Sequence, residues 1–286
     1  MTPPIVSSVS QTREQLDNVR RAGKRIGMVP TMGALHAGHA SLIQRARSEC
    51  DFVVVSIFVN PLQFGPTEDY QRYPRPVEKD VALCAEIGVD LIFAPETSEM
   101  YVSPQITFVE VTRITDYLCG AFRPGHFRGV ATVVLKLFNI VQPDFAYFGE
   151  KDYQQLCVIR RMVEDFNLRV TIVPVPTHRE PDGLAMSSRN VYLSAEERAA
   201  APALYRSLKI AQERIAAGES DVEKIKADSL RLLAAPLIRV QYFEVVDPDD
   251  LQPVEIVSGP VRIAAAIFIG KTRLIDNVSA GDEKHS

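Results

Sequence analysis

The sequence lacks any hydrophobic run that could cross a bilayer, since its longest runs, at 52–55 and 263–269, fall far short of the ~20 residues that a spanning helix needs. It also lacks a basic N-terminal region followed by an apolar stretch, so we expect no signal peptide. The four cysteines form no CxxC pair and are expected to be reduced, mostly buried thiols of a cytoplasmic protein. A net charge of −4 predicts no broad affinity for nucleic acid, so an anionic ligand requires a local positive site.

The common nucleotide-binding fingerprints GxxxxGK[ST] and GxGxxG are missing as well. What the first two-thirds of the chain does contain is an alternation of strand-like and helix-like patterns. This alternation predicts an α/β fold with a doubly wound, parallel, Rossmann-like sheet. The predicted strands are 25–30, 52–59, 90–94, 144–148 and 169–175, and the predicted helices are 38–50, 76–87, 126–141 and 152–166.

The pattern changes near residue 180, where a polar, glycine-containing loop begins. Helices followed by strands are typical of a smaller α+β domain and not of a continued parallel sheet. We therefore predict one domain over 1–180 and a second, lid-like domain over 181–286. The predicted elements of the second domain are helices at 194–218 and 221–235 and strands at 239–246, 261–269 and 273–278.

The stretch TMGALHAGH, residues 31–39, places two histidines three residues apart between a predicted strand and a predicted helix. Ligands of open parallel sheets bind outside the carboxyl ends of the strands, and a helix N-terminus there offers free N–H groups to a phosphate. Gly33 and Gly38 allow the backbone to approach such a ligand closely. His36 and His39 are then expected to donate to phosphate oxygens and to carry positive charge in the transition state.

Other interpretations of this stretch stay open when it is taken alone. A zinc site requires a third ligand and usually the i, i+4 spacing of HExxH, whereas the spacing here is i, i+3 without a glutamate. Two surface histidines in a turn are a simpler alternative.

Two further segments carry the charges that a triphosphate needs. Gly149–Asp152 follows a predicted strand, so Lys151 would reach the same edge of the sheet, although a solvated turn capped by Asp152 has the same pattern. The loop Met186–Arg189 offers two hydroxyls and a guanidinium, which can close over a triphosphate but form a weak signal alone.

Four blocks of sequence, in this order, give the chain its resemblance to the pantothenate synthetase (pantoate–β-alanine ligase) family, one of the adenylyl-transferring α/β proteins that share HxGH. The blocks are MVPTMGALHAGH at 28–39, SIFVNPLQFGPTEDYQRYPR at 56–75, FGEKDYQQL at 148–156 and DGLAMSSRN at 182–190.

The resemblance implies a two-step reaction. Pantoate attacks the α-phosphorus of ATP to give pantoyl adenylate and pyrophosphate, and the amine of β-alanine then displaces AMP to give pantothenate. Mg²⁺ is expected with ATP, held mainly by phosphate oxygens and water and not by a protein metal site. The family also implies a homodimer, and neither nucleic acid nor a membrane is expected as a partner.

The resemblance further implies roles for individual residues. His39 matches the proton donor, and His36 and Lys151 complete the predicted catalytic set. Asn60, Gln63 and Gln155 match the pocket for pantoate, with Gln63 also near β-alanine. The residues that it places at ATP are Met32, Gly33, Ala34, Leu35, His36, Ala37, Gly38, His39, Gly149, Glu150, Lys151, Asp152, His178, Met186, Ser187, Ser188 and Arg189.

His178 departs from the family pattern, which has a small aliphatic residue at this position. The resemblance implies that the backbone here contacts adenine, and such a backbone contact does not depend on the side chain. Arg123 and His126 lie in a matching block and could reach substrate, serve a dimer or cap a helix.

Three alternative functions remain. An adenylyltransferase that makes a dinucleotide would need basic residues in place of Gln63 and Gln155. A degenerate ATP sensor would have lost the charged set that is intact here. A tRNA synthetase would need an anticodon domain or a basic face.

Overall fold

The computed structural model describes residues 2–66 and 68–281. These residues group into two compact units, and the second unit includes two short segments from the first 180 residues. The first unit comprises Met1–Val111, Arg123–Glu150 and Val158–Pro176, and the second comprises Thr112–Phe122, Lys151–Cys157 and Thr177–Ser286. The functional division at residue 180, with a lid after it, stays a prediction.

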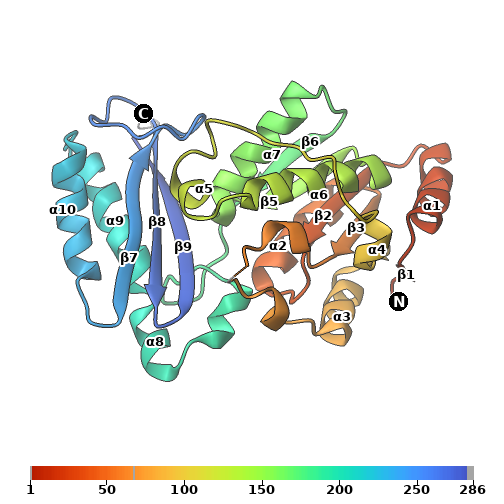
Figure 1. Cartoon of the computed structure of the whole chain (residues 1–286), viewed down its shortest axis with the longest axis horizontal. Coiled ribbons are helices and arrows are strands. Elements are labelled where there is room, and N and C mark those ends of the chain that lie inside the picture. Colours follow the sequence, from red (N-terminus) through yellow and green to blue (C-terminus); the bar gives the residue numbers. More distant parts are fainter. Residues whose placement is uncertain (1, 67, 282–286) are drawn as a thin grey trace. The chain divides into compact units, whose positions relative to one another are not determined.

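A parallel six-stranded sheet forms the centre of the first unit in the described part of the chain (Figure 1). The predicted doubly wound α/β fold is therefore confirmed. The strand order is β1-β4-β3-β2-β5-β6. The strands are β1 (Ile5–Val6), β2 (Ile26–Thr31), β3 (Phe52–Ile57), β4 (Leu91–Phe93), β5 (Phe145–Gly149) and β6 (Thr171–Val175).

The sequence of the central strands explains why helices cover this sheet. In β3, four consecutive residues, Val53–Ser56, are fully buried, as expected for a strand with both faces covered. Helix α2 packs on β2, β3, β5 and β6, whereas α1 packs against α6, which contacts β2. The main helices of this unit are α1 (Val9–Arg21), α2 (Ala37–Glu49), α3 (Val77–Ile87) and α6 (His126–Val141), and α7 (Tyr153–Asp165) runs across the division between the units.

The strand order places two predicted phosphate segments at adjacent strand ends. β2 pairs with β3 on one side and with β5 on the other, so the order of the strands reverses between β2 and β5. The turn after β2 begins at Met32, and Gly149 ends β5. A reversal of strand order is where open α/β sheets bind ligands.

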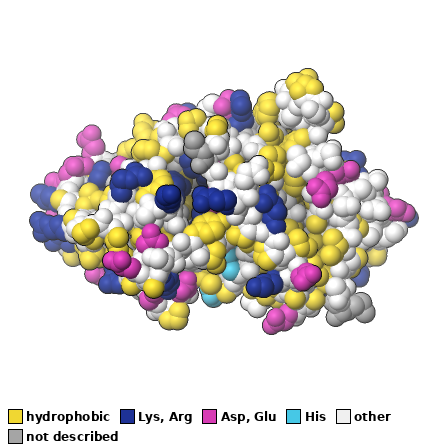
Figure 2. All heavy atoms as spheres, turned by 60° about the horizontal axis from the view of Figure 1, so that its bottom comes forward, with side chains coloured by type: hydrophobic (Ala, Val, Ile, Leu, Met, Phe, Trp, Pro, Cys, Tyr) yellow, Lys and Arg dark blue, Asp and Glu magenta, His cyan; other side chains and the backbone are white. Residues whose placement is uncertain are grey.

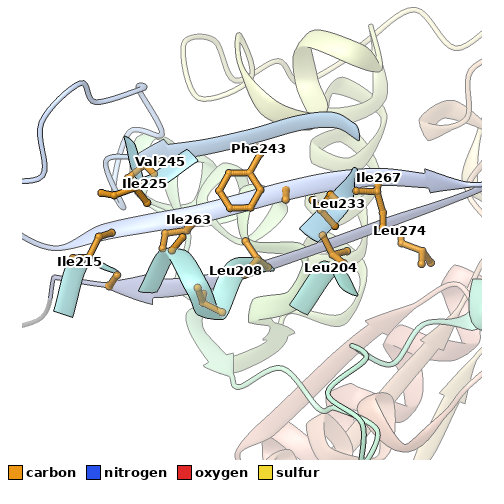
Figure 3. Close-up of a cluster of buried hydrophobic side chains, with 14 of the residues drawn as sticks. Leu204, Leu208, Ile215, Ile225, Leu233, Phe243, Val245, Ile263, Ile267 and Leu274 are labelled. Atoms are coloured by element: carbon orange, nitrogen blue, oxygen red, sulfur yellow. The ribbon is translucent and has the colours of Figure 1, made fainter. Parts of the chain in front are cut away.

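A three-stranded antiparallel sheet, β7-β8-β9, forms the second unit together with helices α9 and α10. Its core contains leucine, isoleucine, valine and phenylalanine side chains from both the helices and the strands, as Figure 3 shows. Each large side chain of this kind contributes about 1.5–3 kcal/mol when buried. The elements are α5 (Leu118–Phe122), α8 (Ala195–Ala200), α9 (Ala203–Ala216), α10 (Val222–Leu233), β7 (Ile238–Val246), β8 (Val261–Ile269) and β9 (Thr272–Ala280).

Two predictions of local structure need correction. The helix predicted over 194–218 is two helices, because Pro202 has no N–H for a continuous helix and instead precedes the first residue of α9. The N-terminal helix α1, capped by Ser8, was not predicted at all. Shorter elements that were also missed are β1 (Ile5–Val6), α4 (Thr97–Met100), α5 (Leu118–Phe122), η1 (Pro61–Gln63), η2 (Tyr70–Arg72), η3 (Glu150–Asp152) and η4 (Ser188–Tyr192). Within the described ranges, no helix is both long and apolar enough to span a membrane.

Candidate active site

The turn after β2 is fixed at its first residue by a threonine. The Thr31 hydroxyl donates to the carbonyl of Ser56 on β3 (2.7 Å) and accepts from the backbone N–H of Gly33 (3.1 Å). Gly33 has φ +79° and Ala34 has φ +51°, so the chain turns sharply through the left-handed region. The glycine of this motif therefore serves the turn itself.

A buried carboxylate holds the other half of the turn. Asp80, in the first part of α3, accepts from the backbone N–H groups of Ala34 (2.9 Å) and Leu35 (2.7 Å). Only 1% of Asp80 is exposed, and burial raises the pKa of its carboxyl although both hydrogen bonds lower it. The free-energy cost of burying this carboxylate is tolerated because its two hydrogen bonds fix the backbone of the turn.

The two histidines form a capping box at the start of α2. Nδ1 of His36 accepts from the N–H of Gly38 (3.1 Å), and Nδ1 of His39 accepts from the N–H of His36 (3.3 Å). Their ring centroids are 4.1 Å apart. Because each Nδ1 is an acceptor, the proton of each neutral ring lies on Nε2, which makes Nε2–H a donor. An imidazolium would point an Nδ1–H at a backbone N–H, so these bonds are those of neutral rings. The positive charge expected in the transition state stays a prediction.

Asn60 lies just after β3, and both the oxygen and the nitrogen of its side-chain amide form hydrogen bonds within the protein. Its Oδ1 accepts from the hydroxyl of Tyr101 (2.7 Å) and from Leu62 N–H (3.3 Å). Its Nδ2 donates to Oε1 of Gln63 (3.1 Å) and to the carbonyl of Gly129 (3.1 Å). Asn60 is 1% exposed. It is therefore suited to orienting its neighbours more than to binding a substrate.

Gln63 links this loop to the histidine turn. It lies in η1, is 9% exposed, and its Nε2 lies 3.0 Å from the sulfur of Met32, which is a weak acceptor. Helix α6 approaches the loop so closely that a Cβ on Gly129 would lie 2.3 Å from the carbonyl oxygen of Leu62. The structure thus brings together Met32, the histidine turn, Asn60 and Gln63.

Arg123 and His126 support the same loop from its outer side. Nδ1 of His126 lies 2.8 Å from the carbonyl oxygen of Gln63 and therefore donates to it, whereas Nε2 accepts from Arg123 (2.9 Å). Arg123 also forms a bidentate ion pair with Glu68 (2.7 and 2.6 Å). Burial raises the pKa of Glu68, but the hydrogen bonds and charge of Arg123 outweigh it, so the pKa lies below its usual value. Of the three roles left open for these residues, the contacts favour support of the Gln63 loop.

The remaining predicted site residues belong largely to the second unit, although Gly149 and Glu150 belong to the first. The backbone carbonyl of Lys151 accepts from Nδ2 of Asn277 (3.0 Å), and its ammonium lies 3.6 Å from Asp152. Gln155 is half-buried on α7. Lys151 is thus held by a residue of β9 that sequence reasoning did not select.

The Met186–Arg189 loop is fixed at both ends. The N–H of Met186 donates to the carbonyl of His178 (3.0 Å), and Ser187 caps η4 by accepting from Arg189 N–H (3.2 Å). The backbone of His178 therefore anchors the loop, whatever its side chain does. Asn190 donates to Glu180 (3.0 Å), which closes the hairpin that carries the loop.

Charged groups are distributed without a dominant sign. On the face shown in Figure 2, basic and acidic side chains are both present and neither covers the surface continuously, in keeping with the net charge of −4. Positive charge for an anionic ligand must therefore come from individual residues.

Sequence reasoning missed residues that hold the predicted segments of each unit, namely Asp80 and Tyr101 in the first unit and Asp276 and Asn277 in the second. No motif marks them, because each acts on a segment that is distant along the chain.

The model of the family described as pantoate-beta-alanine ligase matches residues 4–279 of this chain. The chain belongs to the pantoate–β-alanine ligase family. The predicted resemblance is therefore confirmed, and the chain is an enzyme of the ligase class. A pantothenate synthetase of Pelotomaculum thermopropionicum is 52% identical over 278 residues, covering 97% of this chain and 99% of the relative.

Solved structures of family members agree with this fold. The pantothenate synthetase of Thermus thermophilus is 51% identical, with a TM-score of 0.91 over 96% of this chain and 98% of the relative. The pantoate–β-alanine ligase of Francisella tularensis, solved in complex with β,γ-ATP and β-alanine, is 37% identical, with a TM-score of 0.80 over 96% of this chain and 97% of the relative.

Proposed function

We propose that this chain condenses pantoate with β-alanine at the expense of ATP, through pantoyl adenylate, and releases AMP and pyrophosphate. The observation that carries the proposal is the capping box of His36 and His39 at the N-terminus of α2, in the turn whose Met32 sulfur lies 3.0 Å from Nε2 of the buried Gln63. The complex of the Francisella tularensis relative with an ATP species and β-alanine supports the same ligands for this chain.

In the first step, a pantoate carboxylate oxygen forms a bond to the α-phosphorus, and the bond from that phosphorus to the bridging oxygen of pyrophosphate breaks. Negative charge grows on the leaving pyrophosphate, so neutral Nε2–H donors of His36 and His39 stabilise it without first losing a proton. We propose that the donor role of His39 is a hydrogen bond from Nε2–H and not transfer of its proton. Lys151 and Arg189 supply positive charge, and Ser187 and Ser188 supply hydroxyl donors.

In the second step, the amine of β-alanine attacks the acyl carbon, the amine loses a proton, and AMP leaves with the electron pair of the acyl–oxygen bond. No protein nucleophile is required, in keeping with four cysteines that are all buried. Gln63 and Gln155 are proposed to hold pantoate, because an amide can donate to a carboxylate and accept from a hydroxyl. Asn60 orients Gln63 for this task.

Mg²⁺ is proposed to enter with ATP. Within the described residues, no group of three or more His, Cys, Asp or Glu side chains could hold a metal ion. An ion bound mainly by phosphate oxygens and water fits such a site, because Mg²⁺ retains several waters and needs few protein ligands.

The proposal includes a cytoplasmic location and a homodimer. For the location it is supported by the four cysteines, which are all buried thiols and form no disulfide with one another. For the dimer it is supported by the family resemblance, and sedimentation equilibrium of the purified chain would test it.

The decisive experiment is exchange of labelled pyrophosphate into ATP. We expect exchange that requires pantoate, and release of AMP only when β-alanine is added as well. Exchange that runs equally well without pantoate, or that does not occur, would refute the proposed reaction.

A further inference from the structure

The dipeptide Asp276–Asn277 on β9 contacts Lys151 and the base of the hairpin that carries the Met186–Arg189 loop, both of which the proposed function connects with ATP. The two residues are 3% and 5% exposed. Burial of a carboxylate and an amide in a strand costs free energy unless their hydrogen bonds are made, so the partners of such a pair are informative.

Asn277 holds Lys151. Its Nδ2 donates to the backbone carbonyl of Lys151 (3.0 Å), and its Oδ1 accepts from Nη1 of Arg262 (3.1 Å). The guanidinium of Arg262 lies over the ring of Tyr153, 3.7 Å from its centroid. Because Arg262 engages the oxygen, the amide is oriented with its donor toward Lys151. This bond fixes the backbone from which the Lys151 ammonium extends.

Asp276 holds the hairpin before the Met186–Arg189 loop. It forms a bidentate ion pair with Arg179 (2.6 and 2.9 Å), and Arg179 also donates to the carbonyl of Gly183 (3.1 Å). Arg179 pairs with Ala185 across the hairpin in an antiparallel bridge. A bidentate guanidinium restricts both the position and the plane of the group it binds. The carboxylate therefore fixes the base of the loop.

The two halves are joined to each other. The N–H of Asn277 donates to Oδ1 of Asp276 (2.8 Å). Burial raises the pKa of Asp276, whereas the neighbouring charges of Arg179 and Lys151 lower it. The ammonium of Lys151 therefore also stabilises the charged form of Asp276, and the bonded pair Asp276–Asn277 connects Lys151 to Arg179 at the base of the hairpin.

We propose that Asp276 and Asn277 are positioning residues, which fix the spacing between Lys151 and the Met186–Arg189 loop for binding of the ATP phosphates. The contacts stand by themselves, but the purpose of that spacing rests on the proposed function. Both residues act through their partners and need not touch ATP.

Asn277→Asp tests the proposal with little change in shape. The carboxylate keeps an acceptor for Arg262 but cannot donate to the Lys151 carbonyl. The matched control is Gln212→Glu, since Nε2 of Gln212 also donates to a backbone carbonyl of β9, that of Ser279 (2.6 Å), far from both segments in sequence. Asn277→Ser is a second variant, in case the added charge prevents folding.

For Asn277→Asp we expect ATP binding by isothermal titration calorimetry to weaken at least about tenfold, with a similar loss of kcat in pyrophosphate exchange. The KM for pantoate and the circular dichroism spectrum should stay unchanged, and Gln212→Glu should match the wild type in every readout. In a Lys151→Ala background, Asn277→Asp should cost less than about twofold more, because both changes remove one function.

Wild-type ATP affinity in a folded Asn277→Asp, or losses that simply add to those of Lys151→Ala, would overturn the positioning role. Equal damage from Gln212→Glu would also overturn it. The proposed function fails by a different result, namely wild-type exchange that does not depend on pantoate.

Discussion

Two buried carboxylates, Asp80 in the first unit and Asp276 in the second, hold backbone segments that we propose to bind phosphate. Each is at most 3% exposed, and burial raises the pKa of each. They differ in their partners. Asp80 accepts from the uncharged backbone N–H groups of Ala34 and Leu35, whereas Asp276 pairs with the guanidinium of Arg179.

Because their partners differ, removal of the two carboxylates should change the free energy of unfolding by different amounts. A carboxylate bonded to N–H groups carries the cost of a buried charge without a cation to offset it, so its removal relieves a penalty while the turn loses an anchor. A carboxylate in a buried ion pair offsets a charge that remains when it is removed. We therefore expect changes at the first turn to affect catalysis with little loss of stability, and changes at Asp276 to lower stability in addition to weakening ATP binding.

The largest effect is expected at the turn that Asp80 holds, for His39→Ala. Loss of the Nε2–H donor should lower kcat for pyrophosphate exchange about 10³-fold, at the upper end of the usual range for loss of one donor to a developing anion. His39→Gln is the companion variant, because its amide oxygen can still accept from the His36 N–H while its N–H can donate to phosphate. A His39→Ala variant with most of its activity would remove His39 from the chemistry, and full activity in His39→Gln would show that hydrogen bonding suffices without transfer of a proton.

The next effect is expected in stability, for Asp276→Asn. Asparagine leaves the guanidinium of Arg179, whose side chain is 18% exposed, without its counter-charge, so the free energy of unfolding in urea should fall by about 3 kcal/mol, the lower end of the range for a buried pair. Asp228→Asn removes the partner of Arg214, whose side chain is 46% exposed, and should cost no more than about 1 kcal/mol. Equal losses in the two variants would show that the Asp276–Arg179 pair is no more costly to break than a surface ion pair, and would contradict the stabilising role of Asp276.

A smaller effect, dependent on pH, is expected for Arg123→Met. Because the folded pKa of Glu68 is lowered, its pairing stabilises the fold above the unfolded pKa, and this stability is lost as the pH falls through the folded pKa. The variant should be less stable than the wild type by about 1–3 kcal/mol at pH 7, and the difference should shrink on acidification.

Urea unfolding of both proteins between neutral pH and about pH 3 measures this convergence. The control is Arg161→Met, which breaks a surface pair with Asp165 whose side chains are 54% and 48% exposed and should change little at any pH. A difference for Arg123→Met that stays constant with pH would show that Glu68 is not the group through which Arg123 acts.

The secondary structure could be predicted where the local sequence pattern determines whether a segment forms a strand, a turn or a helix. The β-branched run of β3 and the strand-to-helix junction at Gly38 fall in this class, and both predicted elements are present. The anchors were not predictable, because Asp80 acts on Ala34 from 46 positions away and Asp276 on Arg179 from 97. The protonation of His36 and His39 also required the structure, since only the cap geometry shows Nδ1 as the acceptor.

The smallest change in stability, and the sharpest test of the comparison, is expected for Asp80→Asn. One amide oxygen can still accept from Ala34 or Leu35, but not both in the present geometry, so the turn loses a bond worth about 1 kcal/mol. Removal of the buried charge offsets this loss, so the net change in the free energy of unfolding at pH 7 should be below about 1 kcal/mol. The loosened turn should nevertheless lower kcat for exchange about tenfold.

The pH dependence of Asp80→Asn should run opposite to that of Arg123→Met. The folded pKa of Asp80 is raised, so the wild type takes up a proton on folding as the pH falls through that value, and it gains stability relative to the variant. Urea unfolding of the pair over the same pH range should therefore diverge toward acid in favour of the wild type. If the free energies of unfolding of the wild type and Asp80→Asn instead changed in parallel with pH, Asp80 would not carry a costly buried charge. The proposed difference between Asp80 and Asp276 would then be wrong.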